Sequence, residues 1–206
     1  MGNRTTLSDE VYEAVKALIM DHAIAPGARV TIDAVSRQLD VSPTPVREAL
    51  ARLESDGLVV KRPMAGYTTT PLLTPGEFEQ LFEVRLLLEC AAAARAATQE
   101  TSGVDFPRLP RPVADRGYAG HAAFTAADAA FHDAVAVAGG NPLLRDAITR
   151  LHAHLHVHRI SFPGAGTTEA EHAAIVAAIR SGDPSGADSA MRAHLEAARD
   201  RHRLRT

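Results

Sequence analysis

The stretch from Thr31 to Thr70 decides the fold, and it reads TIDAVSRQLDVSPTPVREALARLESDGLVVKRPMAGYTTT. It predicts a short helix, a tight turn and a second helix, followed by two short extended runs. Three apolar residues share one face of the first helix: Ile32, Val35 and Leu39. Ser42 is a suitable N-cap for the second helix, and Pro43 is tolerated in its first turn.

The second helix buries one side and leaves the other exposed. Its apolar positions are Val46, Leu50 and Leu53, and Gly57 is expected to end it. Residues 58–60 and 67–69 then form a β-hairpin closed by residues 63–66. A helix-turn-helix followed by a β wing places one helix in the major groove of DNA.

Residues 41–60, VSPTPVREALARLESDGLVV, resemble the signature of the GntR family of bacterial winged-helix repressors. The family commonly carries an arginine where this chain has Pro43, so one expected DNA contact is missing. Arg47 keeps its family position and is the first candidate for a DNA contact. The alternative is that Arg47 pairs with Glu48 or Asp56 on a solvated face. Further candidates for DNA contact are Thr44, Ser42, Arg37 and, at the wing tip, Gly66.

Length and composition favour two small domains over one. The chain has 206 residues, which exceeds the usual size of about 100–150 residues for one domain. It is 46% hydrophobic but only 4% aromatic, which suits closely packed helices. Residues 1–70 hold eight Lys/Arg and nine Asp/Glu, a net charge of −1, so any basic surface for DNA must be local.

Cysteine usage and hydropathy indicate a soluble protein of the cytoplasm. Cys90 is the single cysteine and lies in an apolar helical run, where a small buried side chain is expected. The N-terminus lacks a signal-peptide pattern, and no apolar run is long enough to span a membrane.

The fold class predicted is mainly α, with a winged helix-turn-helix in residues 1–70, a linker in residues 71–76 and an antiparallel bundle of about six helices in residues 77–206. Thr74 is a plausible cap for the first helix of the bundle, with Glu77 as its capping-box partner. Residues 101–120 read as a long loop. In the first domain, a further helix is predicted at about residues 8–22. In the second domain, the predicted helices cover approximately residues 77–99, 121–138, 142–159, 168–180 and 186–204.

The C-terminal half resembles the FCD-type effector domain of one large GntR subfamily. The matching pieces are FEVRLLLECAAAARAA (82–97), DAAFHDAVAVAGGNPLL (128–144) and EHAAIVAAIRSGDPSGADSAMRAHL (171–195). The departure is residues 101–120, where that domain usually has another helix.

Spacing also places two pairs of metal-ligating residues on inner helix faces. Asp128 and His132 are four residues apart and therefore share a helix face with apolar neighbours. His172 and His194 lie on the core stripes of two helices joined by a short turn. Both lie about 12 Å from that turn, so they face each other at one level.

A divalent cation bound by these four residues would resolve the cost of burying them. The donor set suits zinc, with nickel, manganese or iron as alternatives, and argues against calcium. The FCD resemblance implies the same four ligands. The alternative is that each histidine is a hydrogen-bonded core residue and Asp128 merely pairs with His132. Four further histidines lie in one predicted helix, and we interpret them as part of its polar surface, with some of them packing against neighbours. They are His152, His154, His156 and His158.

Two residues are candidates for effector binding. Arg85 lies on an apolar stripe, and the family often uses an arginine in this helix to hold a ligand carboxylate. Its alternative is a salt bridge with Glu89 or Glu83. Asn141 is the second candidate, although it most simply caps the helix that begins at Pro142.

The resemblances imply a homodimeric repressor, not an enzyme, that binds a palindromic double-stranded DNA operator and responds to a small organic acid near the metal. The alternatives are a regulator in which the metal itself is the signal, or a helical metalloenzyme with metal-bound water as nucleophile. No general base is marked by the motifs, and an enzyme would leave the winged helix unexplained.

Overall fold

The structure is a computed structural model, and it describes the backbone of residues 6–20, 23–63, 66–110, 117–158 and 165–203. Within these ranges, the side chains of residues 117–123, 152–158, 165–166 and 202–203 are not described. The chain divides into two compact units, and the first break falls between Leu73 and Thr74. This break lies within the expected linker, residues 71–76, although the domain bounds stay a prediction.

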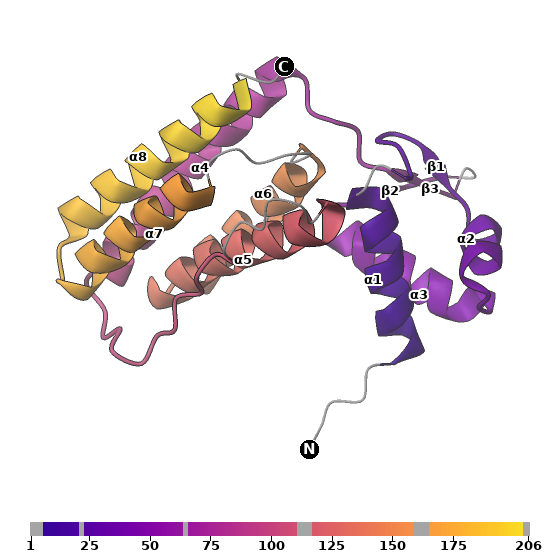
Figure 1. Cartoon of the computed structure of the whole chain (residues 1–206), viewed down its shortest axis with the longest axis horizontal. Helices are drawn as coiled ribbons and strands as arrows, with labels where there is room; N and C mark the ends of the chain where they lie inside the picture. Colours follow the sequence, from indigo (N-terminus) through magenta and orange to yellow (C-terminus); the bar gives the residue numbers. More distant parts are fainter. Residues whose placement is uncertain (1–5, 21–22, 64–65, 111–116, 159–164, 204–206) are drawn as a thin grey trace. The chain divides into compact units, whose positions relative to one another are not determined.

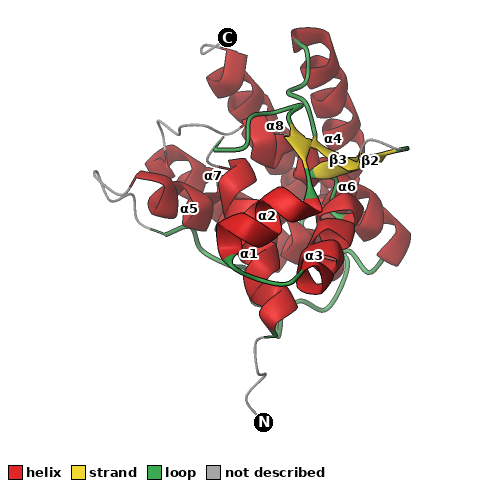
Figure 2. Ribbon diagram, turned by 90° about the vertical axis from the view of Figure 1, so that its right-hand side faces the viewer, coloured by secondary structure: helices red, strands yellow, loops and turns green. Residues whose placement is uncertain are grey.

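The first unit contains three helices and a small antiparallel sheet (Figures 1 and 2). The helices are α1 (Leu7–Met20), α2 (Ile32–Leu39) and α3 (Pro43–Ser55), and the strands are β1 (Arg29–Val30), β2 (Val59–Arg62) and β3 (Gly66–Thr69). This is the predicted helix-turn-helix with its wing. α1 and α3 pack together and bury a core that includes Val15, Ile19, Val46, Leu50 and Leu53.

The sheet has one strand more than the sequence predicted. Its order is β1-β3-β2, with Val60 opposite Thr68 in the hairpin and Arg29 opposite Thr68 on the other edge. β1 is two residues long, too short to show the alternation that marks a strand. Its partner strand therefore had to be known before β1 could be recognised.

The helix starts differ in part from expectation. α1 begins at Leu7, one residue before the predicted start at residue 8: the Thr6 hydroxyl accepts a hydrogen bond from the Asp9 amide at 3.2 Å, and the Ser8 hydroxyl donates to Glu48 of α3. Ser42 is the N-cap of α3 by position, but its side chain makes no capping hydrogen bond.

The second unit contains five helices in the part of the chain that the structure describes, where about six were expected. They are α4 (Pro75–Ala96), α5 (Gly117–Ala138), α6 (Pro142–His158), which belongs to this unit as far as His152, α7 (Ala165–Arg180) and α8 (Pro184–Arg203). α7 and α8 form a hairpin, and both pack against α4, as Figure 1 shows. α5 also packs against α4.

Local sequence signals explain most boundaries in this unit. Thr74 caps α4, and the capping box with Glu77 is complete, as predicted. The expected loop 101–120 is too long, because residues 117–120 belong to α5. Residues 101–110 are not helical, yet they bury Phe106 and Leu109, and the Leu109 amide donates to Glu169 of α7 at 3.0 Å.

The core of the second unit is built from small and branched side chains, as the low aromatic content indicated. It includes Cys90, Ala93, Phe131, Ile175, Met191 and Leu195. The buried position of Cys90 agrees with its predicted role as a small core residue, and burial raises the pKa of its thiol to about 11. No helix among the described residues has both the length and the apolar composition to cross a membrane.

Candidate metal centre

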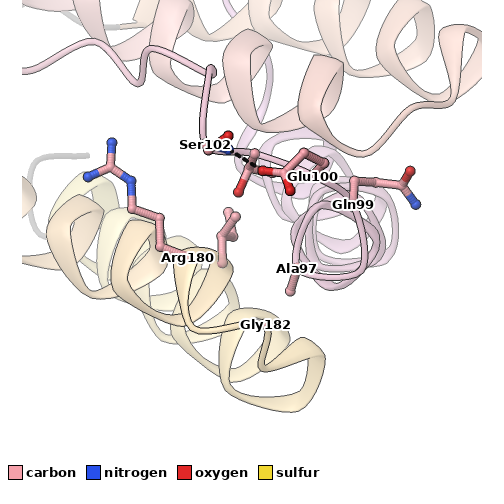
Figure 3. Close-up of a pocket in the computed structure, with 8 residues that line it drawn as sticks. Ala97, Gln99, Glu100, Ser102, Arg180 and Gly182 are labelled. Carbon is pink, nitrogen blue, oxygen red and sulfur yellow. Dashed lines mark hydrogen bonds between the residues drawn. The ribbon is translucent and has the colours of Figure 1, made fainter.

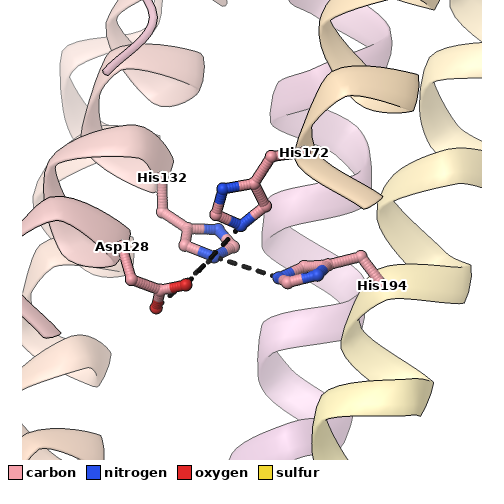
Figure 4. A group of neighbouring side chains, drawn as sticks. All are labelled: Asp128, His132, His172 and His194. Carbon is pink, nitrogen blue, oxygen red and sulfur yellow. Dashed lines mark hydrogen bonds and ion pairs between the residues drawn. The ribbon is translucent and has the colours of Figure 1, made fainter. Parts of the chain in front are cut away.

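Four side chains from three helices of the second unit meet in its core (Figure 4). α5 supplies Asp128 and His132, α7 supplies His172, and α8 supplies His194. All four are buried, and one nitrogen or oxygen atom of each lies within 4.8 Å of the others. The structure therefore brings together the set that the sequence spacing predicted.

The distances within the cluster suit a single divalent cation. His132 Nε2 and His194 Nε2 are 3.3 Å apart, and His172 Nε2 lies 3.5 Å from an Asp128 carboxylate oxygen. The other Asp128 oxygen is 4.0 Å from His132 Nε2. Nitrogen ligands about 2.0–2.1 Å from a tetrahedral metal are separated by roughly 3.4 Å.

His172 gives an independent test of whether a metal fits. Both of its ring nitrogens are buried without a hydrogen bond in the part of the chain that the structure describes. The ring stacks on Phe131, with centroids 3.7 Å apart and planes 7° from parallel. Burial, together with the charges of His132 and His194, lowers the pKa of His172 to about 2. A neutral imidazole has one nitrogen lone pair that can bind a metal ion, and a bound ion would compensate the cost of burying this ring without hydrogen bonds. The cluster therefore fits the metal that the sequence predicted.

His132 is held from behind by a buried ion pair on α4. Its Nδ1 lies 2.6 Å from a Glu89 carboxylate oxygen. Arg85 donates to the same carboxylate, with nitrogen–oxygen distances of 2.6 and 3.4 Å. Metal-bound histidines commonly use a carboxylate on the remote nitrogen in this way, because it fixes the ring and leaves the other nitrogen for the metal.

His194 is held by a second carboxylate, from α7. Its Nδ1 lies 2.8 Å from Glu171 Oε2, and Arg201 of α8 donates to both Glu171 oxygens at 2.7 and 2.9 Å. Although burial alone would raise the pKa of Glu171, its bonds to His194 and Arg201 lower it to about 2. The sequence analysis did not identify Glu171 or Arg201. Arg201 lies seven residues after His194 and so on the same helix face, a spacing that could have indicated it.

The two candidate effector residues have structural partners. Arg85 is fully buried and forms the salt bridge with Glu89 that was its alternative. The Asn141 side-chain oxygen accepts hydrogen bonds from Leu143 and Leu144 at 3.1 and 3.3 Å and so caps α6. Contact of either residue with an effector stays a prediction.

The candidate DNA-contacting residues all lie on the surface of the first unit: Arg47, Thr44, Ser42, Arg37 and Gly66. The acids proposed as alternative partners of Arg47 are engaged elsewhere. Glu48 accepts from Ser8, and Asp56 accepts from the Tyr12 hydroxyl at 2.6 Å. Gly66 has a φ of 82°, which glycine adopts readily at the start of β3.

A cavity of about 430 Å³ opens at one end of the bundle (Figure 3). It lies between the end of α4 with its following loop and the end of α7, and it is lined in part by Gln99, Glu100 and Arg180. Ile179, also in its lining, is seven residues beyond His172, or about 10 Å along the helix. The cavity is therefore distinct from the cluster. The side chains of His152, His154, His156 and His158 lie outside the described residues.

Comparison with known families accounts for both units. Residues 7–68 match the model of the gntR family of bacterial regulatory proteins, and residues 80–197 match the FCD domain. The chain belongs to the GntR family. It is a DNA-binding transcriptional regulator that joins a GntR helix-turn-helix to an FCD domain, and members of this kind are regulators and not enzymes.

Individual GntR relatives agree with this placement. The transcriptional repressor NanR of Cronobacter sakazakii is 30% identical, with 93% of this chain and 84% of NanR covered. A helix-turn-helix regulator of Agrobacterium vitis is 41% identical over 86 residues, which are 42% of this chain and 50% of that relative. The solved structure of a GntR regulator from Rhodococcus sp. RHA1 has the same fold, with a TM-score of 0.69, 24% identity, and 97% and 98% of the two chains covered.

Proposed function

We propose that this GntR regulator is a repressor that binds a palindromic operator as a homodimer, and that a small organic acid bound beside a divalent metal in the FCD domain controls its DNA affinity. The observation that carries the proposal is the buried cluster of Asp128, His132, His172 and His194. The neighbouring helix α4 contains the buried Arg85, which is linked to His132 through Glu89.

The proposed DNA-reading surface is the exposed side of α3 together with the wing. Arg47 and Thr44 are exposed near the start of α3, where a recognition helix contacts base edges. Lys61 and Arg62 are exposed on β2 and supply local positive charge for phosphate contacts. One such surface reads a half-site, so a dimer would read two half-sites about 34 Å apart.

The proposed metal is zinc, with nickel, manganese or iron as alternatives. Three imidazole nitrogens and one carboxylate oxygen form a donor set that these ions accept, whereas calcium prefers oxygen ligands throughout. A bound divalent cation would supply positive charge and, with more than four coordination positions, a place for an effector carboxylate. The four side chains themselves need no rearrangement of the helices to meet such an ion, because their ligand atoms are already within 4.8 Å.

The proposed contact for the effector is Arg85. Its Nη1 is buried without a hydrogen-bond partner among the described residues, although the same guanidinium is bound to Glu89 through Nε and Nη2. An unpaired N–H of a buried cation is costly, and a carboxylate is its natural acceptor. Because Glu89 also contacts His132, an effector at Arg85 would act on the same network that positions a metal ligand.

Control of DNA affinity requires that the effector bind the DNA-bound and free forms with different affinity. The test is a titration of operator binding, using a DNA fragment selected from a random library by the metal-loaded protein. Small mono- and dicarboxylic acids are added one at a time, and a neutral amide of each acid serves as control. The expected result is at least one acid that weakens DNA binding by about 5–150-fold while its amide does not.

Metal removal separates the alternatives. If chelation followed by zinc, nickel or manganese addition switches DNA binding on and off with no acid present, the metal is the signal and the effector proposal is wrong. If neither acids nor metals alter DNA affinity, the regulatory proposal fails, while the DNA-binding function stands.

A further inference from the structure

Two histidines of the cluster each contact a carboxylate that is itself bound to an arginine. The two arginine–carboxylate pairs differ in how far their side chains are exposed. The Arg85 and Glu89 side chains behind His132 are 0% and 2% exposed. The Arg201 and Glu171 side chains behind His194 are 21% and 18% exposed. The second arrangement therefore extends from the buried cluster to the protein surface.

The Glu171–Arg201 pair also joins two helices, whereas Arg85 and Glu89 lie on one. Glu171 belongs to α7, and both Arg201 and His194 belong to α8. The guanidinium binds both carboxylate oxygens, a fork geometry that holds the carboxylate in one orientation. In that orientation Oε2 lies 2.8 Å from His194 Nδ1.

The consequence concerns which ring nitrogen of His194 carries the proton. An ionised carboxylate can only accept, so the bond to Glu171 requires a proton on Nδ1. In the neutral ring, Nε2 then has its lone pair free, and this atom is the one 3.3 Å from His132 Nε2 at the centre of the cluster. With the proton on Nε2 instead, His194 could not be a ligand there.

We propose that Glu171 and Arg201 are positioning residues that fix the Nδ1–H tautomer of His194 and thereby set the affinity of the cluster for its metal. This inference rests on the proposed metal site. The competing explanation is that the pair only ties α7 to α8, as an ordinary surface ion pair would.

The chain contains a matched control for that explanation. Arg145 of α6 binds both oxygens of Asp133 of α5 at 2.7 and 2.8 Å, which reproduces the fork geometry between two helices. The two side chains of this pair are more exposed, at 48% and 36%. Within the described part of the chain, Arg145 makes no side-chain hydrogen bond or ion pair with the four cluster residues. Arg201→Gln and Arg145→Gln therefore remove comparable ion pairs, of which only one supports a histidine.

The first experiment measures zinc affinity by competition with a chelating dye and the thermal unfolding of each metal-free variant. Arg201→Gln and Glu171→Ala are expected to weaken zinc binding about 10–100-fold, while Arg145→Gln leaves it within about twofold of wild type. Arg201→Lys, which keeps the charge without the fork, should restore part of the loss. Equal zinc affinity in Arg201→Gln and Arg145→Gln would overturn the proposal.

The second experiment reads the tautomer directly in the metal-free protein, from the ¹⁵N shifts of the His194 ring. Wild type and Arg145→Gln are expected to show Nδ1–H, and Glu171→Ala is expected to show a mixture or Nε2–H. An unchanged tautomer in Glu171→Ala refutes the positioning role. Because this measurement needs no metal, it tests the positioning of His194 separately from the proposed metal site.

Discussion

The Nε2 atoms of His132 and His194 lie 3.3 Å apart although 62 positions separate the two residues in the chain. Each ring is turned by a carboxylate on its other nitrogen, Glu89 for His132 and Glu171 for His194. The lone pairs of two converging imidazole Nε2 atoms repel each other unless a proton or a cation lies between them. This convergence is the physical basis for the predictions on the metal.

Metal content should be about one divalent ion per chain in the purified protein. His172→Ala and His194→Ala are each expected to lose it, because either change removes one of four ligands from a site that meets within 4.8 Å. Elemental analysis of wild type beside both variants makes the measurement. Chelation should also lower the thermal unfolding temperature of wild type but not of the variants. Full metal content in both variants would show that the ion is bound elsewhere.

Breaking the buried Arg85–Glu89 pair should be far more destabilising than breaking an exposed pair. Arg85→Ala leaves a buried carboxylate without its cation and is expected to lower the free energy of unfolding by about 3–5 kcal/mol. Arg145→Ala, which breaks an exposed pair with Asp133, should cost about 0–1 kcal/mol. Urea unfolding of metal-free proteins compares them. Adding Glu89→Gln to Arg85→Ala should recover part of the loss, and equal losses for the two single variants would contradict the argument.

Arg47 should contribute to DNA affinity and not to stability. Its side chain is exposed on α3, so Arg47→Ala is expected to lower operator affinity by about 1–3 kcal/mol, or roughly 5–150-fold, and to leave urea unfolding unchanged. Arg52 on the same helix is the control, because it pairs with Asp9 at 2.6 Å and lies over the Tyr12 ring. Arg52→Ala should alter DNA affinity less. A larger effect of Arg52→Ala in fluorescence anisotropy would show that the contact surface lies elsewhere.

The contact between α4 and α5 should depend on Gly139. A Cβ at this position would lie 2.9 Å from the Ala92 carbonyl oxygen, which is backbone and cannot turn away. Gly139→Ala is therefore expected to cost about 1–3 kcal/mol of unfolding free energy. Gly103→Ala is the matched control, because a Cβ there meets nothing within 4 Å. Denaturant unfolding of the two variants tests the difference, and a stable Gly139→Ala would mean that the helices separate without cost.

Acid should destabilise the metal-free protein through His172. Burial lowers the pKa of His172 in the folded state to about 2 from an ordinary value of 6.5. Between these values the unfolded chain binds a proton that the folded chain does not, so stability is fully present above pH 6.5 and falls as the pH decreases below it. The His172→Gln variant has no titrating group at this position, so its free energy of unfolding should decrease less steeply as the pH falls. Unfolding free energies measured at neutral and mildly acidic pH give both slopes, and identical slopes would assign the acid sensitivity to other groups.

The sequence by itself determined the features that depend on local spacing. Helical periodicity predicted α2 and α3, and local spacing predicted the capping box of Thr74 with Glu77, because the determinants of each lie within a few residues of one another. The same periodicity placed Asp128 and His132 on one inner face. Equal distances from the α7–α8 turn placed His172 and His194 at one level, and the cost of burying unpaired groups together with the FCD resemblance joined the two pairs into one predicted cluster.

Only the tertiary structure decided how the helices turn about their axes and which partners reach across. Glu171 adjoins His172 in sequence, yet its carboxylate supports His194 on the next helix. Arg85 could have paired with either of two glutamates or with a ligand, and the packing of α5 against α4 directs it to Glu89, which also meets His132. Such contacts depend on the relative rotation and depth of packed helices, which side chains far apart in the chain set together and which no local pattern records.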